Sequence, residues 1–271
     1  MNQPVLHKTT ANQLAATSKN LPHAVLLAGP SGVGLLTIAK NMAKSLASQF
    51  LVIAPDEKGT IGIEIVRELY TKTRTKQTQQ QIIIIDDADA MSLAAQNAFL
   101  KLLEEPTRYT SFLLTSHAAE RLLGTVRSRT QLISIQAVTP AQTEQYLNSL
   151  KVSNARQSQQ LKFIAAGLPA ELFRLISDEA YFSEQASLAR TARQFLSSKH
   201  YDRLILVHRF GNSREQASQL LEHVMRILKY SLEESAKQSL ALQLDKTLKA
   251  AELIKNNGHI RTQLLRLALG L

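Results

Sequence analysis

Short apolar runs and longer amphipathic stretches alternate through the first half of the chain. The apolar runs have the length of strands and lie between polar or turn-forming residues. We therefore predict five strands, at His23–Ala28, Gln49–Ala54, Gln81–Ile85, Ser111–Ser116 and Gln131–Gln136. A helical spacing of apolar residues fills the intervals between them. The predicted helices run from Leu35 to about Ser48, from Ile61 to Arg74 and from Ser92 to Glu104.

Four consecutive isoleucines, Ile82–Ile85, form the centre of the third predicted strand. A strand that is apolar at every position is buried on both faces, which is typical of a parallel sheet covered by helices on each side. The alternation of strands and helices therefore predicts a doubly wound α/β domain.

The strand pattern disappears after Gln136, and helical periodicity continues to the end with breaks at proline and glycine. We expect three parts: the α/β domain over residues 1–137, a small domain of three short helices over 138–178, and a helical bundle over 179–271. The bundle ends in the apolar residues Leu264, Leu265, Leu267 and Leu269.

The composition is that of a globular protein, with 44% hydrophobic and 20% charged residues among 271. No apolar run approaches the roughly 18 residues of a membrane span, and the first residues lack a signal-peptide pattern. We therefore expect a cytoplasmic protein without membrane contact. The absence of cysteine excludes disulfides, thiolate zinc sites and a cysteine nucleophile. The net charge of +10 is spread along the chain, which fits either contact with a DNA backbone or simple surface solvation.

A glycine-rich segment follows the first predicted strand and precedes a helix, which is the context of a phosphate-binding loop. The residues Gly29, Gly32 and Gly34 allow the backbone to approach a phosphate and to direct N–H groups at it. The pattern G-x-x-x-x-G-K-[ST] fits Gly29 and Gly34. However, Leu35 and Leu36 replace the lysine and the hydroxyl residue.

These two replacements remove the charged group and the magnesium ligand of the loop. An ammonium about 4 Å from a phosphate oxygen contributes on the order of 4 kcal/mol at an effective dielectric constant near 20, so hydrolysis should be crippled. Thr37 lies one residue after the position of the hydroxyl residue, and Lys40 lies further along the helix than the position of the lysine. Neither is therefore a good substitute. Two interpretations remain: a nucleotide loop that has lost its chemistry, with weak ATP or ADP binding left open, or a simple strand-to-helix connection.

Two carboxylates, Asp86 and Asp87, follow the isoleucine strand. In active sites such a pair orders magnesium and the attacking water beside the phosphate loop. Asp86 fits the metal position, whereas Asp87 stands where a glutamate usually acts as the base and is one methylene shorter. The alternative is a buried strand that ends in an aspartate capping the next helix.

The segment from Asp87 to Pro106, DADAMSLAAQNAFLKLLEEP, resembles the N-A-L-L-K-x-L-E-E-P helix of clamp-loader subunits in the AAA+ family. This family includes the bacterial DnaX and δ′ proteins and the eukaryotic replication factor C subunits. Residues 112–129, FLLTSHAAERLLGTVRSR, follow the family's spacing from the sensor-1 strand to its S-R-C motif, which here is Ser128-Arg129-Thr130. Weaker similarity at Ile61–Leu69 and Asn256–Leu265 extends the resemblance over most of the chain.

The resemblance implies roles for individual residues. Arg129, with Ser128 before it, would be an arginine finger that acts on the ATP site of a neighbouring subunit. The chain's own degenerate nucleotide site would comprise Gly29, Gly32, Gly34, Thr37, Asp86, Asp87 and Ser116. The three predicted parts would be the AAA+ module, a lid and an oligomerisation collar.

Departures from the family pattern concern the chain's own site. The four-cysteine zinc module of most relatives is missing, and Gly167–Glu171 offers no sensor-2 arginine. These losses, beside a retained Arg129, point to the non-hydrolysing δ′ branch. The resemblance then implies a DNA polymerase III holoenzyme component that is no enzyme alone, requires no cofactor or zinc, and helps load a sliding clamp onto primer-template DNA with DnaX-like and δ-like subunits. The alternatives are an active ATPase of the DnaX or replication factor C type and a purely structural scaffold.

Overall fold

Five parallel strands form one sheet in the computed structural model, which describes residues 4–47, 49–74, 79–107, 109–152, 154–235 and 237–271. The strand order is β2-β3-β4-β1-β5, and each neighbouring pair is parallel. The strands are β1 (Ala24–Ala28), β2 (Gln49–Ile53), β3 (Gln81–Ile85), β4 (Thr110–Ser116) and β5 (Gln131–Ser134). All five predicted strands are confirmed, with ends that differ by a residue or two.

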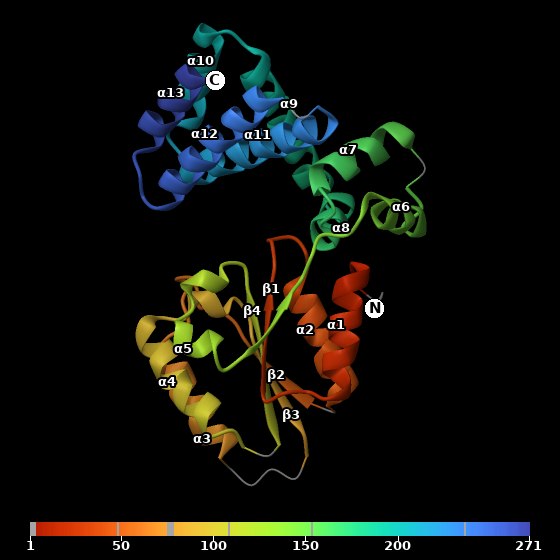
Figure 1. The fold of residues 1–271 in the computed structure, drawn as a ribbon, viewed down its shortest axis with the longest axis vertical. Coiled ribbons are helices and arrows are strands. Elements are labelled where there is room, and N and C mark those ends of the chain that lie inside the picture. The colour runs from red at the N-terminus through yellow and green to blue at the C-terminus, as the bar shows by residue number, and fades with distance from the viewer. Residues whose placement is uncertain (1–3, 48, 75–78, 108, 153, 236) are drawn as a thin grey trace. The chain divides into compact units, whose positions relative to one another are not determined.

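Helices cover both faces of this sheet (Figure 1). Alternate side chains of β1 and β3 enter two separate cores: Val25, Leu27, Ile82 and Ile84 lie in one, and Leu26, Ile83 and Ile85 lie in the other. The first core is closed by α1 (Lys8–Lys19) and α2 (Leu35–Leu46). The second is closed by α3 (Ile63–Thr73), α4 (Leu93–Glu104) and α5 (Gly124–Arg127). The predicted doubly wound α/β fold is therefore confirmed.

Helix boundaries follow local sequence signals. The Ser92 hydroxyl accepts a hydrogen bond from the backbone N–H of Ala95 at 3.2 Å and so caps α4. Helix α2 ends at Leu46, and Ser48, the predicted end, lies outside the described residues. The short 3₁₀ helices η1 (Ala88–Ala90) and η2 (Ala119–Arg121) follow β3 and β4.

The chain after β5 is helical, as predicted. Thr139 begins this part with a capping box shared with Gln142, and Pro140 occupies the first helical turn. The helices are α6 (Pro140–Ser149), α7 (Ala155–Ala165), α8 (Pro169–Ser177), α9 (Glu179–Ser197), α10 (His200–Phe210), α11 (Arg214–Glu234), α12 (Gln238–Lys255) and α13 (Ile260–Gly270). Of the predicted apolar residues in α13, Leu264 and Leu267 are buried in the bundle, while Leu265 and Leu269 are exposed.

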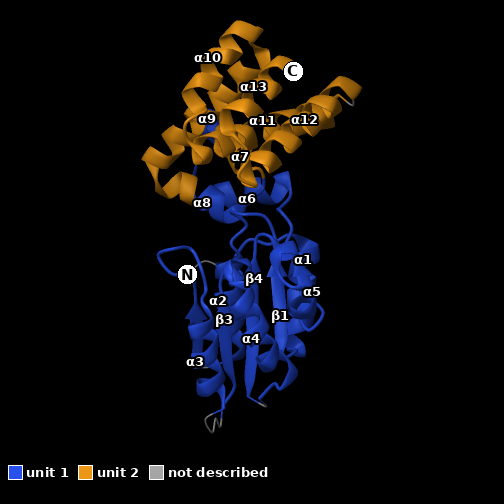
Figure 2. Ribbon diagram, turned by 90° about the vertical axis from the view of Figure 1, so that its left-hand side faces the viewer, with its two compact units in different colours: residues 1–158, 167–173 blue, residues 159–166, 174–271 orange. Residues whose placement is uncertain are grey.

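The chain divides into two compact units (Figure 2). The first unit contains residues 1–158 and 167–173, and the second contains residues 159–166 and 174–271. The start of α8 thus belongs with the α/β sheet, whereas its end belongs with the bundle. The further separation into a lid and a collar stays a prediction. Within the described residues, no helix is both long and apolar enough to span a bilayer.

Candidate functional site

The glycine segment after β1 keeps the backbone shape of a phosphate loop. Gly32 and Gly34 have φ values of 84° and 93°, which only glycine adopts without strain. A Cβ on Gly29 would lie 2.7 Å from the carbonyl oxygen of Ile135. The backbone conformation therefore requires glycine at positions 32 and 34, and the close approach of Ile135 excludes a side chain at position 29.

The side chains that follow the loop do not fit a magnesium–nucleotide. Leu35 occupies the lysine position of the phosphate-loop pattern. It is the first residue of α2, is 2% exposed and packs in the core between α2 and the sheet. Leu36 packs against the same core. Burying a leucine side chain contributes about 1.5–3 kcal/mol to folding. The position that holds lysine in the phosphate-loop pattern is therefore part of the hydrophobic core in this chain. Thr37 is exposed on α2.

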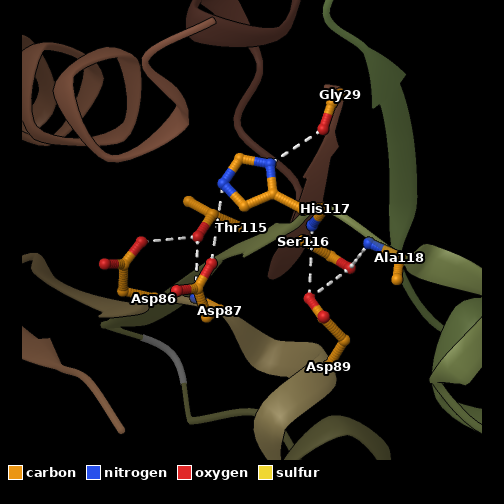
Figure 3. A network of polar contacts seen from close by, with 8 residues as sticks. All are labelled: Gly29, Asp86, Asp87, Asp89, Thr115, Ser116, His117 and Ala118. Carbon is orange, nitrogen blue, oxygen red and sulfur yellow. Dashed lines mark hydrogen bonds and ion pairs between the residues drawn. The ribbon is translucent and has the colours of Figure 1, made fainter. Parts of the chain in front are cut away.

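The order β3-β4-β1 brings the carboxyl ends of three strands side by side. Ligands of parallel α/β sheets usually bind at this edge. The loop follows β1, Asp86 and Asp87 follow β3, and Ser116 ends β4. Four sequence-predicted elements of the site are therefore at one edge of the sheet, as Figure 3 shows for the polar side chains.

A buried hydroxyl connects the two carboxylates to β4. Thr115, which is fully buried, donates to Asp86 Oδ1 at 2.7 Å and accepts from the backbone N–H of Asp87 at 2.9 Å. One residue along, the Ser116 hydroxyl donates to Asp89 Oδ1 at 2.7 Å. Thr115 and Asp89 were not predicted as site residues. A polar side chain within an apolar strand was the signal for Thr115.

His117 is a further residue that was not predicted. Its Nδ1 lies 2.9 Å from the carbonyl oxygen of Gly29, and its Nε2 lies 3.7 Å from Asp87 Oδ1. Because a carbonyl only accepts hydrogen bonds, Nδ1 carries a proton. The ring connects the phosphate-type loop with the second carboxylate (Figure 3).

The environment of Asp87 favours its neutral form. Burial raises the pKa of Asp87 above its ordinary value, as do the negative charges of Asp86 and Asp89, while the His117 charge acts in the opposite direction. The residue also has a left-handed backbone with φ of 47°. The Asp87 carboxylate faces the imidazole of His117.

Ser128 and Arg129 do not belong to this network. They follow α5, where the Arg129 Nη2 lies 2.8 Å from Glu104 Oε1 and Nη1 donates to the Thr125 carbonyl at 3.1 Å. The Arg129 side chain is 38% exposed. The Ser128 hydroxyl also donates to the Thr125 carbonyl, at 3.1 Å. The Arg129 guanidinium is therefore accessible to solvent, and its ion pair with Glu104 fixes its orientation.

Buried Gln96 ties α4 to the segment before α5. Its Oε1 accepts from the backbone N–H of Leu123 at 2.7 Å. Its Nε2 donates to the Met91 carbonyl at 3.1 Å and lies 3.5 Å from the Arg121 carbonyl. The side chain fixes the loop that leads to Arg129, although the sequence pattern gave no sign of this role.

Residues 47–139 match the family model described as DNA polymerase III, delta subunit. The chain is 29% identical over 185 residues to the DNA polymerase III subunit delta′ of Pseudomonas aeruginosa, covering 56% of this chain and 55% of that protein. It is 27% identical over 160 residues to a DNA polymerase III subunit gamma/tau of Mycobacterium bovis, covering 49% and 28%. The matched segments thus span between about a quarter and about half of these relatives.

A similar fold is found in a DNA polymerase III gamma subunit-related protein from Thermotoga maritima, with a TM-score of 0.54 and 17% identity over 96% of this chain and 97% of that one. The parallel sheet, the loop after β1 and the carboxylates after β3 define an AAA+ P-loop module. Together with the matches to DNA polymerase III subunits, these features make the chain similar to the clamp-loader subunits of the AAA+ family.

Proposed function

We propose that this chain is a clamp-loader subunit that hydrolyses no ATP itself and supplies Arg129 to the ATP site of a neighbouring subunit. The observation that carries the proposal is the contrast between Leu35 and Arg129. Leu35 is absorbed into the core at the position of the catalytic lysine. Arg129 keeps an accessible guanidinium in the Ser128-Arg129-Thr130 segment, which resembles the family's finger motif.

The Arg129 contacts favour presentation to a partner. The Glu104 carboxylate and the Thr125 carbonyl engage separate guanidinium nitrogens, which restricts the rotamers of a long side chain before assembly. Because Arg129 is partly exposed, a surface ion pair of this type contributes little to folding, about 0–1 kcal/mol. A partner's phosphate can therefore replace Glu104 at small cost.

In this proposal the chain works inside a DNA polymerase III assembly. Its partners are DnaX-like and δ-like subunits, a sliding clamp and primer-template DNA contacted through the complex. Arg129 stabilises negative charge on the phosphoryl group transferred in the adjacent DnaX-like subunit. The helical second unit mediates assembly, which agrees with the exposed leucines Leu265 and Leu269 on α13.

The test is a complex reconstituted with DnaX-like and δ-like subunits from the same cell. Arg129→Ala should leave assembly intact in gel filtration but lower the DNA- and clamp-stimulated ATPase and slow clamp loading. Arg127→Ala is the matched control, since Arg127 is exposed two residues earlier. Wild-type ATPase and loading in the assembled Arg129→Ala complex would refute the finger role.

A purely structural scaffold is the second candidate, and the Arg129–Glu104 ion pair is the observation that favours it. If that pair serves only to join α4 to the segment after α5, Arg129→Ala and Glu104→Gln should have equal, small effects on stability and none on a partner's ATPase. If Arg129 is a finger, Glu104→Gln should leave the ATPase largely intact because the guanidinium remains.

A further inference from the structure

The place of a metal–phosphate group can be located from the sheet order. In P-loop ATPases the metal ion is held between the loop and an aspartate that follows another strand of the same sheet. In this chain the corresponding groups follow β1 and β3, and β4 lies between these strands. The first residue after β4 is His117. Its side chain lies between the Gly29 carbonyl and the Asp87 carboxylate (Figure 3).

The orientation of His117 is fixed by its own backbone. The N–H of His117 donates to Asp89 Oδ1 at 3.2 Å, and the same oxygen accepts the Ser116 hydroxyl. The Ser116 oxygen in turn accepts from the backbone N–H of Ala118 at 3.1 Å. These contacts hold the end of β4 so that the imidazole points between the loop and β3.

A second contact closes the loop from the side of α8. The carbonyl oxygen of Gly32 accepts hydrogen bonds from the backbone N–H groups of Ala170 and Glu171, each at 3.0 Å. These N–H groups belong to the first turn of α8, where they have no partner within the helix. A Cβ on Gly32 would lie 2.9 Å from the Glu171 Cβ. The loop and the start of α8 are thus in close contact within the first unit.

From these contacts we propose that the phosphate-type loop is closed from within the chain, with His117 filling the space of the metal–phosphate group and Gly32 capping α8. His117 is then a positioning residue that joins the loop to the end of β3 without a nucleotide. The inference deepens the proposed function, on which it rests, because it adds a second barrier to ATP binding beyond Leu35 and Leu36. A bound nucleotide must displace the imidazole.

The main test measures Mg²⁺–ATP affinity of the full chain by titration calorimetry. Restoring the loop with Leu35→Lys and Leu36→Thr should give only a small gain. Adding His117→Ala should raise the affinity by a further factor of about ten or more, comparable to the contribution of one hydrogen bond. A residue with a merely structural role would lower the affinity or leave it unchanged when removed. His200→Ala, an exposed histidine of the second unit, is the control.

Lysine at position 35 enters a packed core and can prevent folding, so a second measurement uses the chain with its native loop. In His117→Ala, backbone amides of Gly29 and of residues 31–34 should exchange with deuterium about tenfold faster or more, because the Gly29 contact is lost. Amides of the second unit should be unchanged. Unaltered exchange of the loop, or an unaltered affinity in a folded loop-restored chain, overturns the proposal.

This outcome is separable from the finger role. If His117→Ala raises nucleotide affinity while Arg129→Ala leaves the assembled complex fully active, the closed loop stands and the proposed finger fails. If Arg129→Ala silences a partner site while His117→Ala changes neither exchange nor affinity, the finger stands and the closed loop is wrong.

Discussion

In the first unit, polar side chains gather at one edge of the sheet and around Arg129, whereas in the second unit buried polar residues contact backbone carbonyls or a single side chain between helices. Arg203 is an example from the second unit, and its guanidinium donates to the carbonyls of Phe195, Leu196 and Ala268. His223 is another, with Nε2 2.9 Å from Gln185 Oε1.

The difference separates two uses of a buried polar group. Arg203 donates to carbonyls near the ends of α9 and α13. Such carbonyls have no partner within their own helix, so these hydrogen bonds stabilise the bundle. The network around Asp86 and His117 instead joins the loop after β1 to the ends of β3 and β4, which are the segments that would form a ligand site. Variants in the second unit should therefore alter stability, and variants around Arg129 should alter a partner's chemistry.

The largest expected effect sharpens this contrast. In the assembled complex, Arg129→Ala should slow hydrolysis at the one site it faces by about 10³–10⁵-fold, or about 4–7 kcal/mol of transition-state stabilisation. Asp86→Ala should leave the ATPase unchanged, because in the proposed function the chain's own site contributes no turnover. Single-turnover hydrolysis by both complexes is the measurement. Arg129→Lys should recover little, since a point charge lacks the planar fork.

In the second unit, the burial of His223 should make the free energy of unfolding depend on pH. Burial, assisted by the Arg226 charge, lowers the pKa of His223 from 6.5 to about 4. Between these values the unfolded chain binds a proton and the folded chain does not. The free energy of unfolding should thus fall as the pH drops from about 6.5 to about 4, by about 3 kcal/mol in total.

The measurement is urea unfolding followed by helical circular dichroism at several pH values. Carboxylates also titrate near pH 4, so the informative quantity is the difference between the wild type and His223→Gln, which cannot titrate. His200→Ala should retain the wild-type pH dependence. A constant difference from pH 7 to pH 4 contradicts the predicted proton linkage.

Much of the fold was predictable because its signals are local. The isoleucine run located β3, and the loss of the strand pattern after Gln136 located the start of the helical part. Helix α1 was not predicted, since two of its three buried positions are the threonines Thr10 and Thr17, which weaken an apolar pattern. Spacing and resemblance found the loop glycines and Asp86. Neither indicated that His117 reaches Gly29, which is 88 positions away, because only the strand order brings those residues together.

Gln96 tests the contrast between the two units, because its hydrogen bonds are to the backbone, as those of Arg203 are, although it lies beside the segment that leads to Arg129. Gln96→Ala should lower the free energy of unfolding by about 2 kcal/mol, since it removes the hydrogen bonds of a buried side chain to the partly buried N–H of Leu123 and to two carbonyls. It should also weaken the ATPase that depends on Arg129. Asn97→Ala, at an exposed position one residue along, should do neither.

The smallest expected effect lies at the start of the same helix. Ser92→Ala removes the cap of α4 and should cost about 1 kcal/mol in urea unfolding. Helix ends fray within a turn, whereas Glu104, the partner of Arg129, lies at the other end of α4. The ATPase of the assembled complex should therefore stay at the wild-type rate. Ser92→Asp keeps the cap, favours the helix dipole and should restore stability. If Ser92→Ala lowered the ATPase as much as Gln96→Ala, the position of Arg129 would depend on the whole of α4 and not on the contact between Gln96 and Leu123.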